Sequence, residues 1–223
     1  MIISNAFNRA FDRAEVVYIE MDPSAFKKSN SAKTLEQLRL VPTAADLLSK
    51  RDYRKLARFA KEKLNMDEAK LSKTPLISLI DEVNRSMLHC DSIKSFEAYI
   101  INRAASNSQF IGGIETVRDQ VNAFNKVYLK SQSKQLMRIV NNYDKESKIY
   151  ESFIASYREQ NLSKLSQGNQ TTSQRNTTWI LKMIATMKRK SAFFALGARH
   201  LAGEKGLISL LRKSGYNVEP VFY

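Results

Sequence analysis

The sequence is poor in the residues that form disulfide bonds or bind transition metals. Its 223 residues include one cysteine, Cys90, and two histidines, His89 and His200. A single cysteine cannot form an internal disulfide, and it excludes the structural zinc sites that need several cysteines. A metal centre in this chain would therefore depend on carboxylates and on very few imidazoles.

Long apolar runs are also lacking. Charged residues interrupt the longest of them, so no segment reaches the roughly 18 apolar residues that a transmembrane helix needs. The first residues pass directly into an amphipathic pattern, without the cationic and apolar regions of a signal peptide. We therefore expect the chain as written to stay in the cytoplasm. A true start further upstream that carried a signal would instead direct it to the cell envelope.

Glycine and proline, which interrupt regular structure, are scarce at seven and four residues. The pattern predicts a mostly helical chain, with consecutive helices over residues 34–107 and a long helix over about 117–164. Short apolar runs predict strands near 16–19, 109–112, 191–196 and 216–222. We therefore predict one α/β domain over residues 1–223, rich in helix, with a few-stranded central sheet and a large helical insertion at about 34–107.

Positive charge is in excess, with 36 Lys and Arg against 22 Asp and Glu and a net charge of +14. Such an excess favours association with phosphate-rich polymers or anionic membranes and carries no information about the fold. The cations gather on two predicted helices: Lys50, Arg51, Arg54, Lys55, Arg58, Lys61 and Lys63 on one, and Lys126, Lys130, Lys134 and Arg138 on the other.

These two basic stripes suit phosphate backbones or anionic headgroups. A merely solvated helix face is the alternative. Nucleic acid is the less favoured partner, because no helix-turn-helix, RNP or zinc-finger pattern accompanies the stripes. Peripheral contact with an anionic membrane and assembly into a homo-oligomer are both compatible with the sequence.

Carboxylates follow two of the predicted strands. Glu20 and Asp22 end the first strand, and Glu115 comes just after the second, which we predict Gly112 and Gly113 to close. The carboxyl ends of strands in open α/β sheets are where ligands bind. The alternative is that Glu20 and Asp22 are solvated, and that Glu115 is a favourable charge in the first turn of the next helix.

The third predicted strand leads into a histidine. Gly197 lets the chain turn off the strand, and His200 then projects over the strand ends, where an imidazole can bind a metal or transfer a proton. The alternative is that His200 caps the next helix or completes a hydrogen bond in the core. Serine hydrolase elbows, P-loops, dinucleotide fingerprints and His-Glu-x-x-His motifs are absent from the sequence.

Residues 197–221 resemble the C-terminal Gly-x-x-His block of the TraB/GumN family, which includes the Tiki metalloproteases. Three shorter blocks agree in order. Residues 16–22 are similar to a strand that ends in Glu-x-Asp, residues 113–116 to a Gly-Leu-Glu-Thr segment, and Arg175 and Asn176 with Trp179 to an Arg-Asn-x-x-Trp motif. The resemblance covers nearly the whole chain.

The resemblance implies a fold related to erythromycin-esterase and ChaN-like proteins, and a metal-dependent hydrolase that acts on peptides or proteins. It also implies that His200 and Glu20 bind a divalent transition metal, which activates water or polarises a carbonyl. By the same resemblance Glu20, Glu115 and Arg175 are the catalytic groups, with Gly197 and Asn176 supporting them. We assign Trp179 to the core.

The chain departs from the family in one respect. The family's first Gly-x-x-His lies upstream of the helix that begins here near Ser4, and residues His89 and Cys90 do not reproduce it. Adjacent helical residues diverge by about 100°, so we expect both to be buried filler. Either the true start lies upstream, or this is a shortened relative that acts as a non-catalytic interaction protein and binds a partner, a membrane or nucleic acid through its basic helices.

Overall fold

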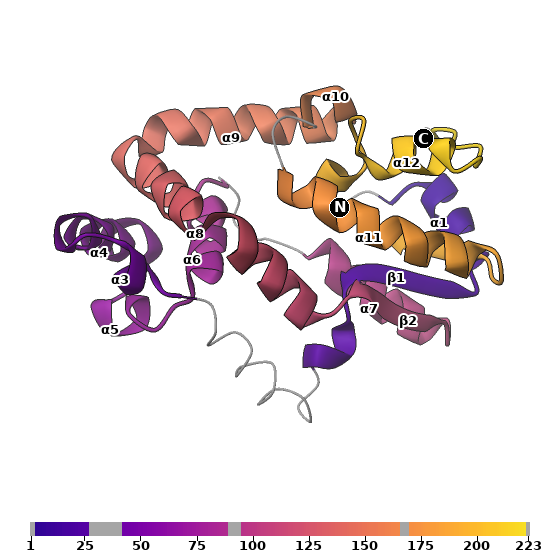
Figure 1. Cartoon of the computed structure of the whole chain (residues 1–223), viewed down its shortest axis with the longest axis horizontal. Helices are drawn as coiled ribbons and strands as arrows, with labels where there is room; N and C mark the ends of the chain where they lie inside the picture. The colour runs from indigo at the N-terminus through magenta and orange to yellow at the C-terminus, as the bar shows by residue number, and fades with distance from the viewer. Residues whose placement is uncertain (1–2, 27–41, 89–94, 166–169, 222–223) are drawn as a thin grey trace.

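The computed structural model describes residues 3–26, 42–88, 95–165 and 170–221 (Figure 1). In these residues three parallel strands form one sheet in the order β2-β1-β3. The strands are β1 (Val16–Met21), β2 (Phe110–Glu115) and β3 (Ala192–Ala195). Because the strands are parallel, their carboxyl ends lie at one edge of the sheet. Helices make up most of the rest, which confirms the predicted helix-rich α/β fold.

The helices lie before, between and after the strands. Around β1 are α1 (Asn5–Asp12) and the short helix η1 (Pro23–Phe26), and before β2 come α3 (Ala44–Leu47), α4 (Lys50–Leu64), α5 (Glu68–Leu71), α6 (Leu76–Ser86) and α7 (Phe96–Ser106). Between β2 and β3 are α8 (Val117–Asn141), α9 (Tyr143–Arg158), α10 (Leu162–Leu165) and α11 (Gln170–Met187). The short helix η3 (Ala198–His200) and α12 (Leu207–Lys213) follow β3.

Each face of the sheet packs against helices. Val17 and Ile19 of β1 join Phe11 of α1 and Ile100 of α7 in one buried cluster. On the opposite face, Ile114 of β2 packs with residues of α11 and α12, among them Trp179, Met183 and Leu207. Successive residues of a strand point to opposite faces, and so one short strand can serve both clusters. The sheet is thus the middle layer of three.

The segment between β1 and β2 contains helices and no strand in its described residues, as predicted for the insertion. Leu56, Leu79 and Leu136 belong to a buried core that α4, α6 and the second half of α8 form. Figure 1 shows α4 at the end of the molecule away from the sheet, and α8 running from the sheet toward it. Helix α7 lies inside the predicted insertion yet packs on the sheet. The assignment of all residues to a single domain stays a prediction.

The glycine pair in β2 does not end the strand, and that prediction was wrong. Gly113 pairs with Ile19 inside the sheet, and a Cβ atom there would lie 2.0 Å from the backbone nitrogen of Asp22. The glycine is needed for the close approach of β1. Glu115 is consequently the last residue of β2, and α8 begins after Thr116, which forms a capping box with Asp119.

Three other boundaries differ from the prediction. The long helix predicted over 117–164 is interrupted at Asn142, and Thr172 and Ser173, predicted as loop, lie in α11. Residues 216–221 form no strand: the carbonyl of Val218 accepts a hydrogen bond from the Arg212 guanidinium, and Pro220 has no N–H to donate to a ladder. The predicted helix at 34–40 lies outside the described residues.

Candidate functional site

A cavity of about 440 Å³ opens at the carboxyl ends of the strands. Four of the sequence-predicted site residues line it: Glu20 of β1, Arg175 of α11, and Gly197 and His200, which follow β3. Phe153, Ile154 and Tyr157 of α9 form an apolar wall. We call this cavity the strand-end cavity. Its position is the one at which open α/β sheets bind ligands.

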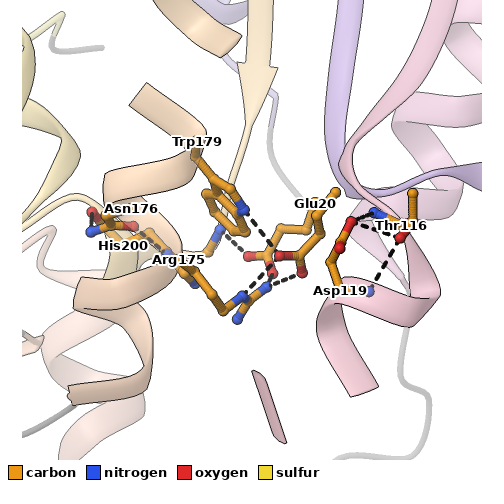
Figure 2. Close-up of polar contacts among 9 residues, drawn as sticks. Glu20, Thr116, Asp119, Arg175, Asn176, Trp179 and His200 are labelled. Carbon is orange, nitrogen blue, oxygen red and sulfur yellow. Dashed lines mark hydrogen bonds and ion pairs between the residues drawn. The ribbon is translucent and has the colours of Figure 1, made fainter. Parts of the chain in front are cut away.

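Arg175 bridges the two predicted carboxylates (Figure 2). Its Nε and Nη2 atoms donate to both oxygens of Glu115, at 3.1 and 2.5 Å, and Nη2 also donates to Glu20 Oε2 at 3.0 Å. The side chains of Glu115, Arg175 and Glu20 are 5%, 17% and 20% exposed. Two carboxylates against one guanidinium leave the group with one net negative charge.

Helix α11 explains how Glu115 is held. Arg175 and Trp179 lie four residues apart, so their side chains lie on the same face of the helix. The Trp179 indole donates from Nε1 to Glu115 Oε2 at 3.0 Å, and the guanidinium of Arg175 lies 4.6 Å from the indole ring centre. A carboxylate buried this deeply is stable when it is charged only if such donors surround it.

The backbone at the end of β3 holds Glu20. The N–H of Gly197 donates to Glu20 Oε1 at 2.8 Å, while Arg175 occupies the other oxygen. A Cβ atom on Gly197 would lie 2.8 Å from the same Oε1 atom. Glycine at this position therefore lets the carboxylate reach the backbone donor.

His200 is held in one orientation by Asn176. The amide nitrogen of Asn176 donates to the backbone carbonyls of His200 and Lys205, at 3.0 and 2.8 Å, which fixes the direction of the amide. Its Oδ1 atom then faces His200 Nδ1 at 2.6 Å. Since Oδ1 can only accept, Nδ1 carries the proton and Nε2 keeps its lone pair.

The imidazole is also buried and neutral. Its ring stacks on Trp179 with 4.2 Å between ring centres, and the residue is 3% exposed. Burial is the main reason that the pKa of His200 is lowered from 6.5 to about 4; Arg175 lowers this pKa further and Glu20 opposes the shift. A lowered pKa keeps the Nε2 lone pair free of a proton at neutral pH.

The residues at the strand-end cavity fit a divalent metal in the type of donor and not in their number. An imidazole and a carboxylate are ligands that transition metals accept. Catalytic zinc sites use three protein ligands, and the described part of the chain contains no group of three His, Cys, Asp or Glu residues that could hold an ion. His89 and Cys90, expected to be buried filler, lie outside the described residues.

The structure thus brings Glu20, Glu115 and Arg175 together, with Asn176 and His200 in contact beside them. Asp22 accepts a hydrogen bond from the backbone of Ser24 and does not join them. Sequence reasoning missed the role of Trp179, although the spacing of four residues from Arg175 was a usable signal. It also missed the α9 wall, for which the sequence offers no signal.

The predicted basic residues lie elsewhere. Arg51, Arg54, Lys55 and Arg58 are exposed on α4, and Lys134 is exposed on α8. Lys126 and Lys130 belong to α8, but their side chains are not described.

The chain was compared with curated proteins, with solved structures and with sequence models of protein families. No curated protein and no solved structure matches it. Among the described residues, every helix is too short or too polar to cross a bilayer. The sequence model of the TraB/PrgY/gumN family matches residues 3–220. That match spans almost all of the 223 residues and includes every residue of the strand-end cavity, so the chain belongs to the TraB/PrgY/gumN family.

Proposed function

We propose that the protein is a metal-dependent hydrolase that cleaves peptides bound in the strand-end cavity. The observation that carries this proposal is the fixed imidazole of His200, whose Nε2 lone pair is set by the hydrogen bond from Nδ1 to Asn176. A histidine that binds a metal characteristically donates its other ring N–H to an oxygen of the protein. The low pKa of His200 leaves Nε2 unprotonated at neutral pH, so a proton does not compete with a metal for this atom.

A carboxylate beside the imidazole supports a cation in the same place. Glu20 lines the cavity with His200, and the cations Arg175 and Arg199 line it as well. A divalent ion bound there would polarise a peptide carbonyl or lower the pKa of a water molecule. His200 and Glu20 would be two of its ligands.

The side chains that line the strand-end cavity suit a peptide. Phe153, Ile154 and Tyr157 offer an apolar wall, which favours large apolar side chains. On the other side, His200 and Glu20 lie where the scissile bond would be. We infer that peptides with a bulky apolar residue next to that bond are the preferred substrates.

Peptide hydrolysis by the full chain tests this function. The purified protein is incubated with a mixed peptide library and Zn²⁺, Mn²⁺ or Co²⁺ in turn, and cleavage is followed by mass spectrometry. We expect metal-dependent cleavage that His200→Ala abolishes. The control is Gln174→Ala, which changes an exposed residue of α11 and should leave cleavage unchanged. Equal cleavage by the two variants would contradict the proposal.

A second candidate is a non-catalytic protein that binds peptides in the same cavity. The observation that favours it is the engagement of both carboxylates by Arg175, which fills the position of a cation between them. This candidate predicts that a library peptide is retained by the full chain without being cleaved under any of the three metals. Cleavage that depends on His200 would exclude it.

A further inference from the structure

Helix α4 presents a broad cationic surface to solvent. Six side chains define this α4 basic face, and all six are exposed: Lys50, Arg51, Arg54, Lys55, Arg58 and Lys61. At about 100° per residue they fall within an arc of about 140° around the helix. The helix has a seventh cation, Lys63, and only two carboxylates, Asp52 and Glu62. Figure 1 shows α4 at the end of the molecule away from the sheet.

The opposite face of α4 is already buried. Leu56 and Ala60 are 0% exposed, and with Phe59 they belong to the core that α4 shares with α6 and α8. An amphipathic helix that lies in a membrane interface needs its apolar side chains free to enter the lipid. Helix α4 cannot offer them without unfolding that core. Any surface that it meets is therefore met through charge alone.

Several positions of the α4 basic face are unfavourable within the helix itself. Lys50 and Arg51 lie in the first turn, where the helix dipole disfavours positive charge. Lys50 and Arg54, Arg51 and Lys55, and Arg54 and Arg58 are like charges four residues apart. In the part of the chain that the structure describes, none of the six forms an ion pair with a carboxylate. A phosphate-bearing partner would remove this repulsion.

We propose that the α4 basic face attaches the protein to anionic lipid headgroups. A helix of 15 residues is about 22 Å long, and six cations spread along and across it match the charge of a flat lipid surface. Duplex nucleic acid is the less favoured partner, because no helix-turn-helix or zinc-finger pattern in the sequence would place α4 in a groove. Single strands fit less well too, because Tyr53 and Phe59 are not exposed for stacking.

Vesicle flotation with the full chain tests the proposal. The probes are vesicles of phosphatidylcholine alone and of phosphatidylcholine with a minority of phosphatidylglycerol. We expect binding only to the anionic vesicles, and its loss at about 1 M NaCl, where screening is nearly complete. The test variant Arg51→Gln/Arg54→Gln/Lys55→Gln/Arg58→Gln should bind at least about tenfold more weakly.

A second variant distinguishes the effect of the α4 basic face on vesicle binding from the effect of net charge. Four exposed cations on other helices are changed to Gln, namely Lys145, Lys148, Arg158 and Lys213. Both variants lose the same charge, so only the test variant should lose vesicle binding. Thermal unfolding of both variants checks that they fold. Equal loss in both variants would overturn the proposal, as would tighter binding to duplex DNA than to anionic vesicles at the same salt concentration.

Discussion

Asn176 holds His200 at both ends of the residue: its Oδ1 atom lies 2.6 Å from the imidazole Nδ1, and its amide nitrogen donates to the His200 carbonyl at 3.0 Å. One side chain therefore fixes the backbone position, the ring orientation and the tautomer of the histidine. Asn176 is 2% exposed, and so none of these bonds is readily replaced by water. The strand-end cavity depends on this pair.

Removing the asparagine should destabilise the fold. Asn176→Ala leaves the carbonyls of His200 and Lys205 and the imidazole Nδ1 without their partner. We expect the free energy of unfolding in urea to fall by about 1 to 3 kcal/mol. Asn102→Ala, at an exposed position of α7, is the control and should change it by less than about 0.5 kcal/mol. Similar losses in both variants would show that Asn176 has no special role.

Stability should depend on pH through His200. Its folded-state pKa of about 4 is below the ordinary 6.5, so between these values the unfolded state binds the proton and the folded state does not. The contribution is complete above pH 6.5 and is lost as the pH falls toward 4. In metal-free buffer we expect the unfolding free energy attributable to His200 to fall by about 1 to 2 kcal/mol between pH 7 and 5.

The matched variant for this pH dependence is His200→Asn. It cannot titrate in this range, so the difference in unfolding free energy between wild type and variant should shrink as the pH falls. A difference that stays constant from pH 7 to 5 would show that His200 has an ordinary pKa in the folded protein.

Two arginine ion pairs, one buried and one exposed, should differ greatly in their effect on stability. Arg175→Met leaves the buried carboxylate of Glu115 without its bidentate partner, and we expect a loss of about 3 to 5 kcal/mol. Arg138→Met removes a pair with Glu146 in which the arginine side chain is 62% exposed, and it should cost less than about 1 kcal/mol. Urea unfolding of both variants measures the two losses in unfolding free energy, and the loss in Arg175→Met should be at least twice the loss in Arg138→Met.

The two glycines of β2 should respond differently to alanine. In Gly113→Ala the new methyl group meets the backbone of β1, with 2.0 Å to the Asp22 nitrogen, and we expect a loss of about 3 kcal/mol or more, or failure to fold. In Gly112→Ala it meets the movable ring of Phe110 at 3.1 Å and should be better tolerated. Circular dichroism during thermal unfolding would detect the difference, and equal melting temperatures would refute the explanation.

The sequence predicts the first three strands well because β-branched and aromatic residues gather in short runs there. It fails where tertiary neighbours decide. Gly113 resembles a turn signal because a close approach between strands cannot be seen in one strand alone. Val218 lies in a strand-like run, but no ladder forms there, and its carbonyl bonds to Arg212.

The candidate site, too, could be predicted only in part, because some of its contacts depend on tertiary neighbours. Family resemblance selected Glu20, Glu115, Arg175 and His200, and the structure places all four at or next to the strand-end cavity. The resemblance did not indicate that a single guanidinium would engage both carboxylates, because that depends on which face of α11 is turned toward the ends of the strands. Trp179 was assigned to the core, and it is both core and hydrogen-bond donor.

Calorimetric titration of the full chain with Zn²⁺ measures whether the fixed imidazole of His200 binds a metal. We expect saturable uptake by the wild-type protein and a large loss of affinity in His200→Ala. The loss in Asn176→Ala should be smaller, about 10- to 100-fold, because the ring remains and only its support is removed. Zinc binding of equal affinity in wild type and His200→Ala, or no saturable uptake by the wild-type protein, would contradict this expectation.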